Sequence, residues 1–503
     1  MMSLPQQIPN WLKKRAFLTP ERPALIFENE TLTFQDTYNR AIDMSKKLAA
    51  ISIKHGDFVG VLLRNHYDTV IIFYALQMLG ATAVILNNRL TGEELAWQLE
   101  DSKCTSLISE DQFSTTLDLL NAKQPSYQIW TKQQLLSLEQ PNIETDLREE
   151  FILDEVCSIM YTSGTTGFPK GVIQTYGNHW WSAIGSVLNL GLTDKDIWLC
   201  NMPLFHISGY SILIRSVVYG MPILLHDGFN ERKVIDDIRT YQVTIMSVVA
   251  ASLSRIVKEL GSERLSEQFR CMLLGGGPAS LSLLDSCKNS GIPVFQTYGM
   301  TETASQIVTL SPVDSIRKLG SAGKPLFPAQ LKIVNRDGLE LSANEEGEIV
   351  VKGPNVTPGY LYRETETAEK ICDSWLHTGD IGYVDEEGFL YVLDRRADLI
   401  ISGGENIYPA EIEGVLLSHE AIAEAGVVGV DDEKWGQVPV AFVVREAGKA
   451  VTEAELLAYC QQKIANYKIP KKIMFTDSLP RNASNKLMRR SLREQLERGD
   501  DEV

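Results

Sequence analysis

The chain has few cysteines and no paired cysteine motif. Its seven cysteines are scattered, odd in number and without a single C-x-x-C pair. Disulfide scaffolds and structural zinc sites are both built from such pairs, so the sequence argues against both. We therefore expect reduced thiols in a cytoplasmic protein.

Long hydrophobic runs and a secretion signal are also missing. Near the N-terminus, Trp11 and Leu12 are followed directly by three basic residues, with no apolar segment of the kind that precedes a cleavage site. The longest apolar run, residues 70–86, is interrupted by Gln77 and Gly80 and falls short of the ~20 residues that span a bilayer. We predict no membrane span, and we interpret the run as a buried helix followed by a strand.

Positive charge is in deficit. The chain has 48 Lys and Arg against 65 Asp and Glu, which gives a net charge of −17. Proteins that coat nucleic acid or acidic lipid carry the opposite balance, so we expect no nucleic-acid partner. Any anionic ligand must be held by a local group of donors.

Glycine and proline are too sparse for a fibrous or low-complexity chain. There are 36 Gly and 20 Pro among 503 residues, and 44% of the chain is hydrophobic. This is ordinary globular usage, and the length corresponds to two to four domains. A large enzyme core is compatible with both. The sequence leaves open whether the protein forms a homo-oligomer.

The first 330 residues alternate between strand-like and helix-like segments, a pattern typical of parallel α/β sheets. Asn178 is suited to cap one of the intervening helices, and Pro278 to the first turn of another. Short apolar runs bounded by Gly, Pro or Ser predict strands at 156–161, 197–202, 222–226, 243–249, 270–274 and 294–297.

The pattern changes twice along the rest of the chain. Strand-like runs at 331–335, 347–352 and 381–393 predict a β-rich subdomain over about 330–394. Later, a helix after Pro409, two strands and a helix opened by the capping box Thr452–Glu455 predict a compact α+β unit. We expect a large α/β domain over 1–394, a charged hinge linker at 395–398 and a small C-terminal α+β domain over 399–503.

The most informative motif is Tyr161-Thr-Ser-Gly-Thr-Thr-Gly-Phe-Pro-Lys-Gly171, directly after a predicted buried strand. Its glycines, hydroxyl groups and Lys170 can surround phosphate oxygens. It is not a Walker A loop, which requires Gly-Lys-Ser/Thr in succession and a helix immediately afterwards.

Two further loops follow predicted strands. Gly275-Gly276-Gly277 lets a flat ring or a phosphate approach the backbone, although a tight turn without a ligand explains it equally well on its own. Tyr298-Gly-Met-Thr301-Glu302 combines an aromatic ring, a hydroxyl and a carboxylate that can hold Mg²⁺ together with phosphate oxygens. The presence of three such loops favours a nucleotide site over core packing.

Three single residues are weaker candidates. His206 lies between apolar residues and is suited either to core packing or to catalysis. Asp380 can accept hydrogen bonds from a ribose diol or can be an ordinary turn residue. Lys486 lies in a basic segment, 463–493, which suits a polyanionic substrate or a solvated face.

Taken together, these motifs resemble those of the acyl-adenylate-forming superfamily, which comprises acyl-CoA synthetases, adenylation domains of peptide synthetases and firefly-type luciferases. The phosphate-loop motif, Tyr298–Glu302, Thr378–Asp380 and Ser402–Pro409 occur in the family's order, and the resemblance extends from Leu18 to Lys486. It implies that a carboxylate attacks MgATP to give acyl-AMP and pyrophosphate, and that coenzyme A then displaces AMP. It also implies that a mobile C-terminal domain rotates between the two steps.

The resemblance also implies residue roles. Thr301 and Glu302 would hold the α-phosphate and the magnesium ion, Lys486 would bridge the carboxylate and the α-phosphate, and His206 would border the acid. Nucleotide and coenzyme A binding would fall to Ser163, Thr165, Thr166 and Lys170 at the phosphates, Gly275, Gly276, Gly277 and Tyr298 at the adenine, Asp380 and Arg395 at the ribose, and Gly403 and Gly404 in the coenzyme A channel.

Within the superfamily, the sequence is most similar to the o-succinylbenzoate–CoA ligases of menaquinone biosynthesis. The similarity rests on Gln174–Ala183, Pro203–Gly209, Lys318–Leu326 and Arg481–Leu487. A dicarboxylic acid needs a donor for the carboxylate that is not activated, and Arg215, on an otherwise apolar segment, is our candidate. A surface arginine on an amphipathic helix is an equally good interpretation of Arg215.

Three alternatives remain open at this stage. The chain could be an acyl-CoA ligase for another aryl or fatty acid, which only substrate preference would distinguish. It could be an adenylation domain that charges a carrier protein in trans. It could also be a nucleotide-binding regulator without catalysis, although the intact lysines and acidic residues of the motifs argue against that reading.

Overall fold

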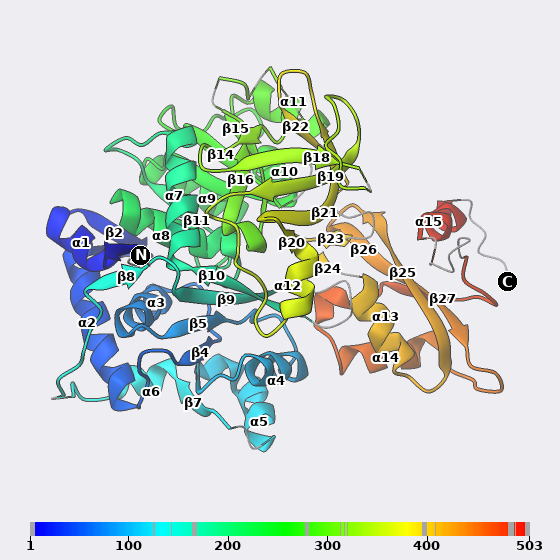
Figure 1. The fold of residues 1–503 in the computed structure, drawn as a ribbon, viewed down its shortest axis with the longest axis horizontal. Coiled ribbons are helices and arrows are strands. Elements are labelled where there is room, and N and C mark those ends of the chain that lie inside the picture. Colours follow the sequence, from blue (N-terminus) through cyan, green and yellow to red (C-terminus); the bar gives the residue numbers. More distant parts are fainter. Residues whose placement is uncertain are drawn as a thin grey trace. The chain divides into compact units, whose positions relative to one another are not determined.

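The computed structural model describes residues 6–123, 126–141, 143–162, 169–276, 281–311, 313–315, 317–318, 320–335, 337–394, 400–407, 409–480, 487 and 489–497. The chain forms two compact units. The first unit consists of Met1–Asn88, Leu99–Tyr161 and Gly171–Leu393, and the second of Arg89–Gln98, Thr162–Lys170 and Asp394–Val503. Helices and strands alternate along most of the first unit (Figure 1).

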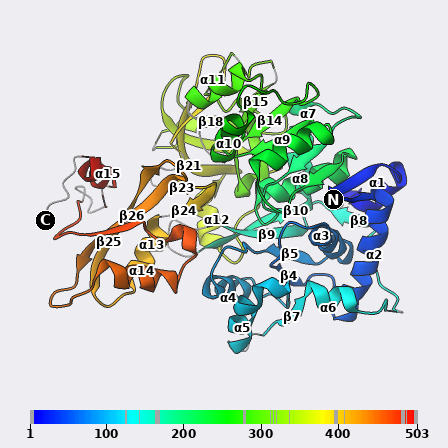
Figure 2. The ribbon, with the colours of Figure 1, turned by 180° about the vertical axis from the view of Figure 1, so that it is seen from behind.

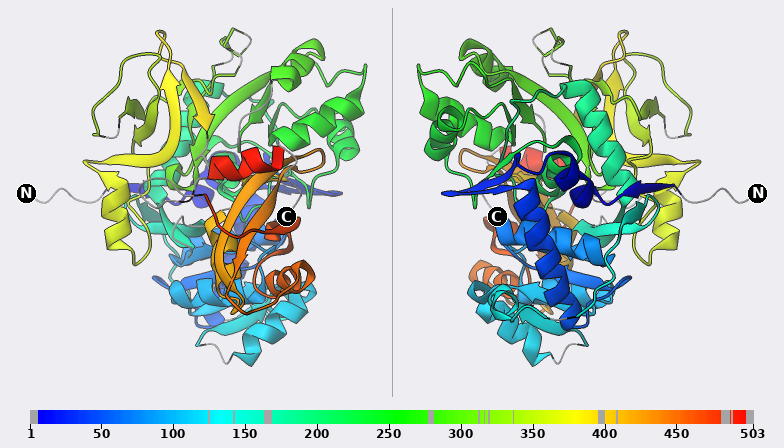
Figure 3. Two further views of the ribbon diagram at one scale, coloured as in Figure 1. Left: turned by 90° about the vertical axis from the view of Figure 1, so that its right-hand side faces the viewer. Right: turned by 90° about the vertical axis from the view of Figure 1, so that its left-hand side faces the viewer.

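A six-stranded sheet has the order β10-β9-β5-β4-β6-β7, and four of its neighbouring pairs are parallel. Its strands are β4 (Phe58–Val61), β5 (Thr82–Ile85), β6 (Ser106–Ser109), β7 (Gln128–Thr131), β9 (Val156–Thr162) and β10 (Lys170–Thr175). The helices of this region are α2 (Phe34–Ala50), α3 (Tyr67–Leu79), α5 (Ser114–Ala122) and α6 (Lys132–Ser137), while α4 (Gly92–Asp101) begins in the second unit and ends in the first. The long α2 is the blue helix in the right-hand view of Figure 3.

The apolar run 70–86 is a buried helix followed by a strand, as the sequence predicts. Every residue of α3 from Thr69 to Leu79 is buried, and β5 follows within three residues. Gly80 ends the helix in the left-handed region at φ 72°, a conformation that glycine adopts without steric cost.

A nine-stranded sheet has the order β17-β16-β15-β14-β13-β11-β12-β2-β3. Its central strands are parallel, while β3, β16 and β17 run antiparallel to their neighbours. The strands are β2 (Pro23–Phe27), β3 (Glu30–Thr33), β11 (Trp198–Cys200), β12 (Ile223–Leu225), β13 (Ile245–Val248), β14 (Cys271–Leu274), β15 (Val294–Met300), β16 (Ser305–Thr309) and β17 (Lys324–Pro325).

The helices of this second region are α1 (Trp11–Leu18), α7 (Tyr176–Leu190), α8 (Ile207–Tyr219), α9 (Glu231–Thr240), α10 (Ala250–Leu260) and α11 (Leu281–Asn289). Figure 2 shows α8, α9 and α10 from behind. A short antiparallel pair joins β1 (Gln7–Pro9) and β8 (Glu150–Ile152). The strand predictions for β9 and β11–β15 are confirmed, although β15 continues three residues beyond the predicted end.

The start of α7 differs from the prediction. Thr175, not Asn178, is the N-cap, and its side chain accepts a hydrogen bond from the amide of Asn178. The Asn178 side chain bonds back to the amide of Thr175, which completes a capping box. The capping residue must be extended, and the chain is already helical at Tyr176, so Asn178 occupies the third helical position. Pro278 lies outside the described residues.

The β-rich part of the first unit is an antiparallel sheet with the order β18-β19-β21-β20, in which β22 also pairs with β21. Its strands are β18 (Gln330–Val334), β19 (Gly347–Lys352), β20 (Ile371–Cys372), β21 (Trp375–Val384) and β22 (Leu390–Asp394), and its helix is α12 (Glu364–Lys370). The three strand-like runs predicted here are present.

The second unit has a five-stranded sheet with the order β24-β23-β26-β25, in which β27 also pairs with β26. The strands are β23 (Ile400–Ser402), β24 (Glu405–Ile407), β25 (Ile422–Asp432), β26 (Gly436–Arg445) and β27 (Lys472–Phe475), and the helices are α13 (Pro409–Leu417), α14 (Glu453–Gln461) and α15 (Arg489–Glu497). The capping box predicted at Thr452 and Glu455 opens α14.

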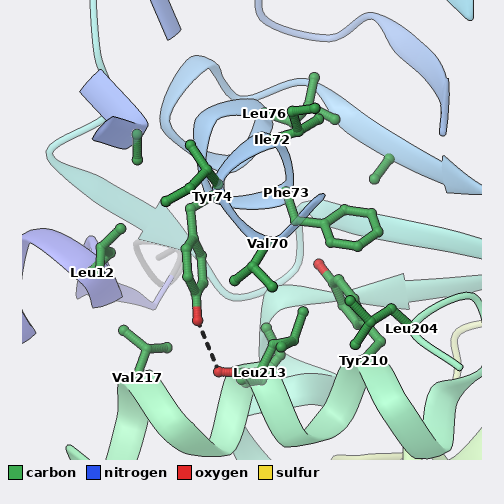
Figure 4. Close-up of a cluster of buried hydrophobic side chains, with 14 of the residues drawn as sticks. Leu12, Val70, Ile72, Phe73, Tyr74, Leu76, Leu204, Tyr210, Leu213 and Val217 are labelled. Atoms are coloured by element: carbon green, nitrogen blue, oxygen red, sulfur yellow. Dashed lines mark hydrogen bonds between the residues drawn. The ribbon is translucent and has the colours of Figure 1, made fainter. Parts of the chain in front are cut away.

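The largest core cluster fixes α8 against α3, and Figure 4 shows part of it. The Tyr74 hydroxyl donates a hydrogen bond to the carbonyl of Leu213, 3.1 Å away. The rings of Phe73 and Tyr210 meet edge to face, with centroids 5.1 Å apart. Because α8 carries both His206 at its N-cap and Arg215, this packing sets the position of two candidate site residues.

The described residues bear on two expectations, the lack of a membrane span and the reduced state of the cysteines. In that part of the chain, no helix is both long and apolar enough to cross a bilayer. The seven cysteines are free thiols, and six of them are buried. Burial raises the pKa of the Cys157 thiol to about 12, so this group stays protonated at neutral pH.

Candidate active site

Two of the predicted loops meet at the carboxyl edge of the nine-stranded sheet. Gly275 follows β14, and Thr297 lies in the parallel neighbour β15 (Figure 1). A Cβ atom added to Gly275 would lie 3.2 Å from Cγ2 of Thr297, so the two loops are in close contact. Gly276 has φ 85°, which favours glycine there. Ligands of open α/β sheets bind at this edge.

The tyrosine motif starts inside a strand rather than after one. Tyr298 lies in β15, whose antiparallel partner β16 extends the pairing to Met300. The Tyr298 hydroxyl donates a hydrogen bond to Oδ2 of Asp380, 2.7 Å away, and both side chains are buried. The structure thus brings together the residues predicted to border the adenine and to hold the ribose.

Thr301 and Glu302 form a tight turn between β15 and β16. The turn is the 3₁₀ helix η2 (Thr301–Thr303), which ends at Ala304. Ala304 and Ser305 have φ values of 50° and 103°, a backbone region that residues other than glycine rarely adopt. Such strain persists only where the surrounding structure holds it, and it is concentrated at functional sites.

Hydrogen bonds to four consecutive carbonyl groups hold this turn in place. The donors come from three segments of the first unit: β10, α7 and the loop that follows β19. They are Gln174 Nε2 to Thr301 (2.9 Å), the Thr357 amide to Glu302 (2.7 Å), Asn355 Nδ2 to Thr303 (2.9 Å) and Ser182 Oγ to Ala304 (2.7 Å). The backbone of the turn is therefore fixed independently of the Glu302 side chain.

The carboxylate of Glu302 is 8% exposed, and its Oε1 accepts a hydrogen bond from the hydroxyl of Tyr360 at 3.0 Å. Within the described ranges, no Lys or Arg forms an ion pair with this carboxylate, and no group of three or more His, Cys, Asp or Glu side chains is placed to hold a metal ion. A single carboxylate with one oxygen not engaged by Tyr360 suits Mg²⁺, which typically takes its remaining ligands from substrate phosphates and water.

Gln174 also belongs to a buried hydrogen-bond network that includes Ser158 and His179. Its Oε1 accepts from Ser158 Oγ at 2.9 Å, and the same Oγ lies 2.9 Å from Nε2 of His179. Burial lowers the pKa of His179 to about 3, so the imidazole is neutral, and no described residue bonds to its Nδ1. These residues hold the turn through Gln174 rather than reaching a ligand themselves.

Arg215 is a fully buried cation without an acidic partner among the described residues. Arg215 is 2% exposed, one terminal NH₂ group donates to Ser305 Oγ at 3.2 Å, and its Nε has no hydrogen-bond partner in the described part of the chain. The guanidinium lies over the Trp198 ring, 5.2 Å from the centroid. Burial lowers the pKa of Arg215. The surface-arginine interpretation is therefore wrong.

His206 is the N-cap of α8, and its carbonyl accepts from the amides of Gly209 and Tyr210. It precedes Arg215 by nine residues, which corresponds to about 13 Å along the helix axis. The structure therefore does not place these two candidate substrate-binding residues side by side. Any acid that contacts both would have to lie along α8.

The phosphate-loop motif is described only at its ends. Tyr161 lies in β9, and its hydroxyl donates to Oδ2 of Asp101 at 2.7 Å. Lys170 is the first residue of β10. Asp101 also pairs with Arg363, so the entry to the loop is tied to a charged group that the sequence interpretation did not include.

In the second unit, Gly403 and Gly404 form the turn between β23 and β24, with φ values of 57° and 87°. The Gly403 amide donates to the carbonyl of Trp435 at 2.8 Å. A Cβ on Gly403 would lie 2.8 Å from the indole ring, so only glycine fits. The remaining predicted site residues, Ser163, Thr165, Thr166, Gly277, Arg395 and Lys486, lie outside the described residues.

The sequence interpretation missed Tyr360 and gave Gln174 no role. Gln174 opens one of the motifs that carry the finer resemblance, so a signal for it was present. Tyr360 follows a glycine in an otherwise ordinary loop, 58 residues after Glu302 in sequence. Only the folded chain shows that its hydroxyl meets the carboxylate.

Comparisons with known proteins identify the family of this chain. Residues 12–361 match the AMP-binding enzyme family, and residues 411–486 match the C-terminal domain of AMP-binding enzymes. The chain is 55% identical over 486 residues to the 2-succinylbenzoate–CoA ligase of Geobacillus kaustophilus, with 97% of each chain covered. It is 53% identical over 492 residues to that of Bacillus cereus, covering 98% of this chain and 99% of the relative.

Solved structures of o-succinylbenzoate CoA synthetase from Bacillus subtilis are also similar. A double mutant bound to a product analogue has a TM-score of 0.93 at 49% identity, covering 97% of this chain and 99% of that one. A complex with ATP and a magnesium ion has a TM-score of 0.75 at 49% identity, covering 97% and 100%. By sequence, site and fold, this chain belongs to the AMP-binding enzyme family.

Proposed function

We propose that the protein is a 2-succinylbenzoate–CoA ligase that works through an acyl-AMP intermediate. The observation that carries this proposal is Arg215, a buried cation without an acidic partner in the described structure, which bonds Ser305 three residues after Glu302. The identity of 55% to a ligase of that name supports it. The fold alone would be compatible with many acids.

The nucleotide is the first substrate. Gly275, Gly276 and Tyr298 border the adenine, and Asp380, which accepts from Tyr298, also accepts hydrogen bonds from the ribose diol. The hydroxyl of Thr301 would contact the α-phosphate, and the carboxylate of Glu302 would hold Mg²⁺. When bound, the ion neutralises phosphate charge. Ser163, Thr165, Thr166 and Lys170 bind the terminal phosphates, Gly277 borders the adenine and Arg395 binds the ribose.

The first step joins the acid to AMP. A carboxylate oxygen of the acid attacks the α-phosphorus, and the bond from that phosphorus to pyrophosphate breaks. Negative charge accumulates on the oxygens of the attacked phosphoryl group, where the ammonium group of Lys486 stabilises it. His206 borders the carboxylate that reacts.

The second step forms the thioester. The coenzyme A sulfur attacks the acyl carbon, the acyl–phosphate bond breaks, and AMP leaves while the thiol loses its proton. Gly403 and Gly404, which have no side chains, line the channel for the thiol arm. We propose that residues 1–394 and 399–503 act as two domains, including a β-rich subdomain over about 330–394, and that the linker 395–398 is the hinge between the two steps.

Arg215 selects the dicarboxylic acid. A buried charge without a partner costs several kcal/mol, and a carboxylate that binds it removes that cost. The guanidinium can bind a carboxylate in bidentate fashion, which favours the acid with a second carboxylate over benzoate or a fatty acid. We place the reaction in the cytoplasm, as one step of menaquinone biosynthesis.

The test is release of AMP and pyrophosphate with MgATP and coenzyme A over a panel of acids: 2-succinylbenzoate, benzoate, 4-coumarate, and medium- and long-chain fatty acids. We expect 2-succinylbenzoate to give the highest kcat/KM. Preference for another acid would keep the adenylation mechanism and reject the substrate. No AMP with any acid would favour a regulator.

A further inference from the structure

Tyr360 contacts the carboxylate of Glu302, the group in the turn that is proposed to hold the magnesium ion. Its hydroxyl donates to Oε1 of Glu302 at 3.0 Å, and the two side chains are 7% and 8% exposed. A hydrogen bond between a phenol and a carboxylate is charge-assisted, and burial strengthens it because little water competes. The orientation of the Glu302 carboxylate therefore depends on Tyr360.

The position of Tyr360 is set by the strand that follows the phosphate-loop motif. Tyr360 forms an antiparallel bridge with Val172 of β10. On either side, the Leu361 amide donates to the Gly171 carbonyl at 2.8 Å, and the Ile173 amide donates to the Gly359 carbonyl at 3.1 Å. The backbone at Tyr360 is thus held by antiparallel pairing with β10. From this position, its side chain reaches Glu302 in the turn.

The backbone of that turn does not need the phenol. Its four carbonyl groups accept hydrogen bonds from Gln174, Thr357, Asn355 and Ser182. Removing the hydroxyl group of Tyr360 would therefore leave the turn in place and free only the Glu302 side chain to rotate. This separation makes the contribution of one hydroxyl group measurable.

We propose that Tyr360 is a positioning residue for the metal-binding carboxylate, an inference that rests on the proposed function. By occupying Oε1, the hydroxyl directs the other oxygen, Oε2, towards the nucleotide phosphates. Mg²⁺ demands near-octahedral geometry, so a carboxylate held in one orientation binds it better than one that rotates. Residues that orient a metal ligand commonly change metal affinity or activity 10- to 100-fold when they are replaced.

The test uses Tyr360→Phe in the full chain, with Mn²⁺ as the metal probe. Electron paramagnetic resonance measures free Mn²⁺ in the presence of enzyme and saturating ATP, and calorimetry measures AMP binding without metal. We expect the variant to bind Mn²⁺ about tenfold more weakly in the ATP complex, with AMP affinity within about twofold of the wild type. The Mg²⁺ concentration for half-maximal rate should rise by a similar factor.

The matched control is Tyr74→Phe, which also removes a buried, hydrogen-bonded phenol hydroxyl but lies in α3, away from the turn. This control should leave Mn²⁺ affinity unchanged. If Tyr360→Phe lowers thermal stability yet leaves Mn²⁺ affinity as in the control, Tyr360 has only a structural role and the inference is wrong. A wild type that releases no AMP with any acid would instead reject the proposed function.

Discussion

The hydroxyl of Tyr298 donates a hydrogen bond to Oδ2 of Asp380, 2.7 Å away, and joins β15 to β21 inside the first unit. Asp380 is further fixed by its amide, which donates to Thr378 Oγ1 at 3.1 Å. The aromatic residue that we propose to border the adenine therefore also orients the carboxylate proposed to bind the ribose. In the proposed nucleoside site, a single hydroxyl group thus connects the adenine side to the ribose side.

Replacing Tyr298 with Phe should weaken nucleoside binding without removing the ring. A hydrogen bond to a charged group contributes about 1.5–3 kcal/mol, so we expect AMP to bind about tenfold or more weakly, as measured by calorimetry without metal. Tyr383→Phe serves as the control, because Tyr383 stacks on Tyr391 in the same β-rich sheet. Equal AMP affinity in wild type and Tyr298→Phe would show that Asp380 needs no such support.

Replacing Arg215 with Met should separate substrate recognition from folding. We expect KM for 2-succinylbenzoate to rise about 100-fold, because loss of one partner of a buried charge pair costs about 2–5 kcal/mol, while KM for ATP stays the same. The free protein should melt at the same temperature or higher, because it no longer buries a charge that lacks an acidic partner in the described structure. An unchanged KM for the acid would rule out Arg215 as the carboxylate partner.

Lys486→Ala should impair the two half-reactions unequally. We expect acyl-AMP formation to fall by about 100-fold or more, because the cation that stabilises the attacked phosphoryl group is lost. Thioester formation from preformed acyl-AMP should be spared, since the attack in that step is at the acyl carbon and not at the phosphorus. Pyrophosphate release and single-turnover thioester formation measure the two steps separately. Equal losses in both would contradict this division of labour.

Much of the α/β framework follows from local sequence. Short apolar runs bounded by turn residues located β9 and β11–β15, because a buried parallel strand is hydrophobic on both faces. Glycine, hydroxyl and carboxylate residues after those strands marked the site, since the carboxyl ends of neighbouring parallel strands share one edge. The hydrogen bond between Tyr298 and Asp380 could not be predicted from local sequence, because it depends on how β21 packs against β15.

The contact between Tyr360 and the turn could not be predicted for the same reason. The contact of Tyr360 with Glu302 depends on the register between residue 360 and β10, and no local pattern reports that register. The burial of Arg215 is similar, because a helical period alone did not show whether its face of α8 meets solvent or β16. At the start of α7, both Thr175 and Asn178 are good capping residues, and the backbone conformation decided between them.

His179 should make the stability of the protein fall in acid. Burial lowers the pKa of His179 to about 3, whereas an unfolded histidine titrates near its ordinary value of about 6.5. Between these two pKa values the unfolded state binds one more proton than the folded state, so a fall in pH favours unfolding. The free energy of unfolding is therefore fully retained above pH 6.5 and decreases as the pH falls towards 3. The expected loss is about 1.4 kcal/mol for each pH unit below 6.5.

Because Gln is neutral throughout, His179→Gln should show a flatter decline in melting temperature between pH 6.5 and 4, even if its melting temperature at pH 7.5 is lower. Replacing the exposed His55 with Gln should leave the steep decline intact. Parallel profiles for wild type and His179→Gln would mean that the buried imidazole does not control the acid sensitivity.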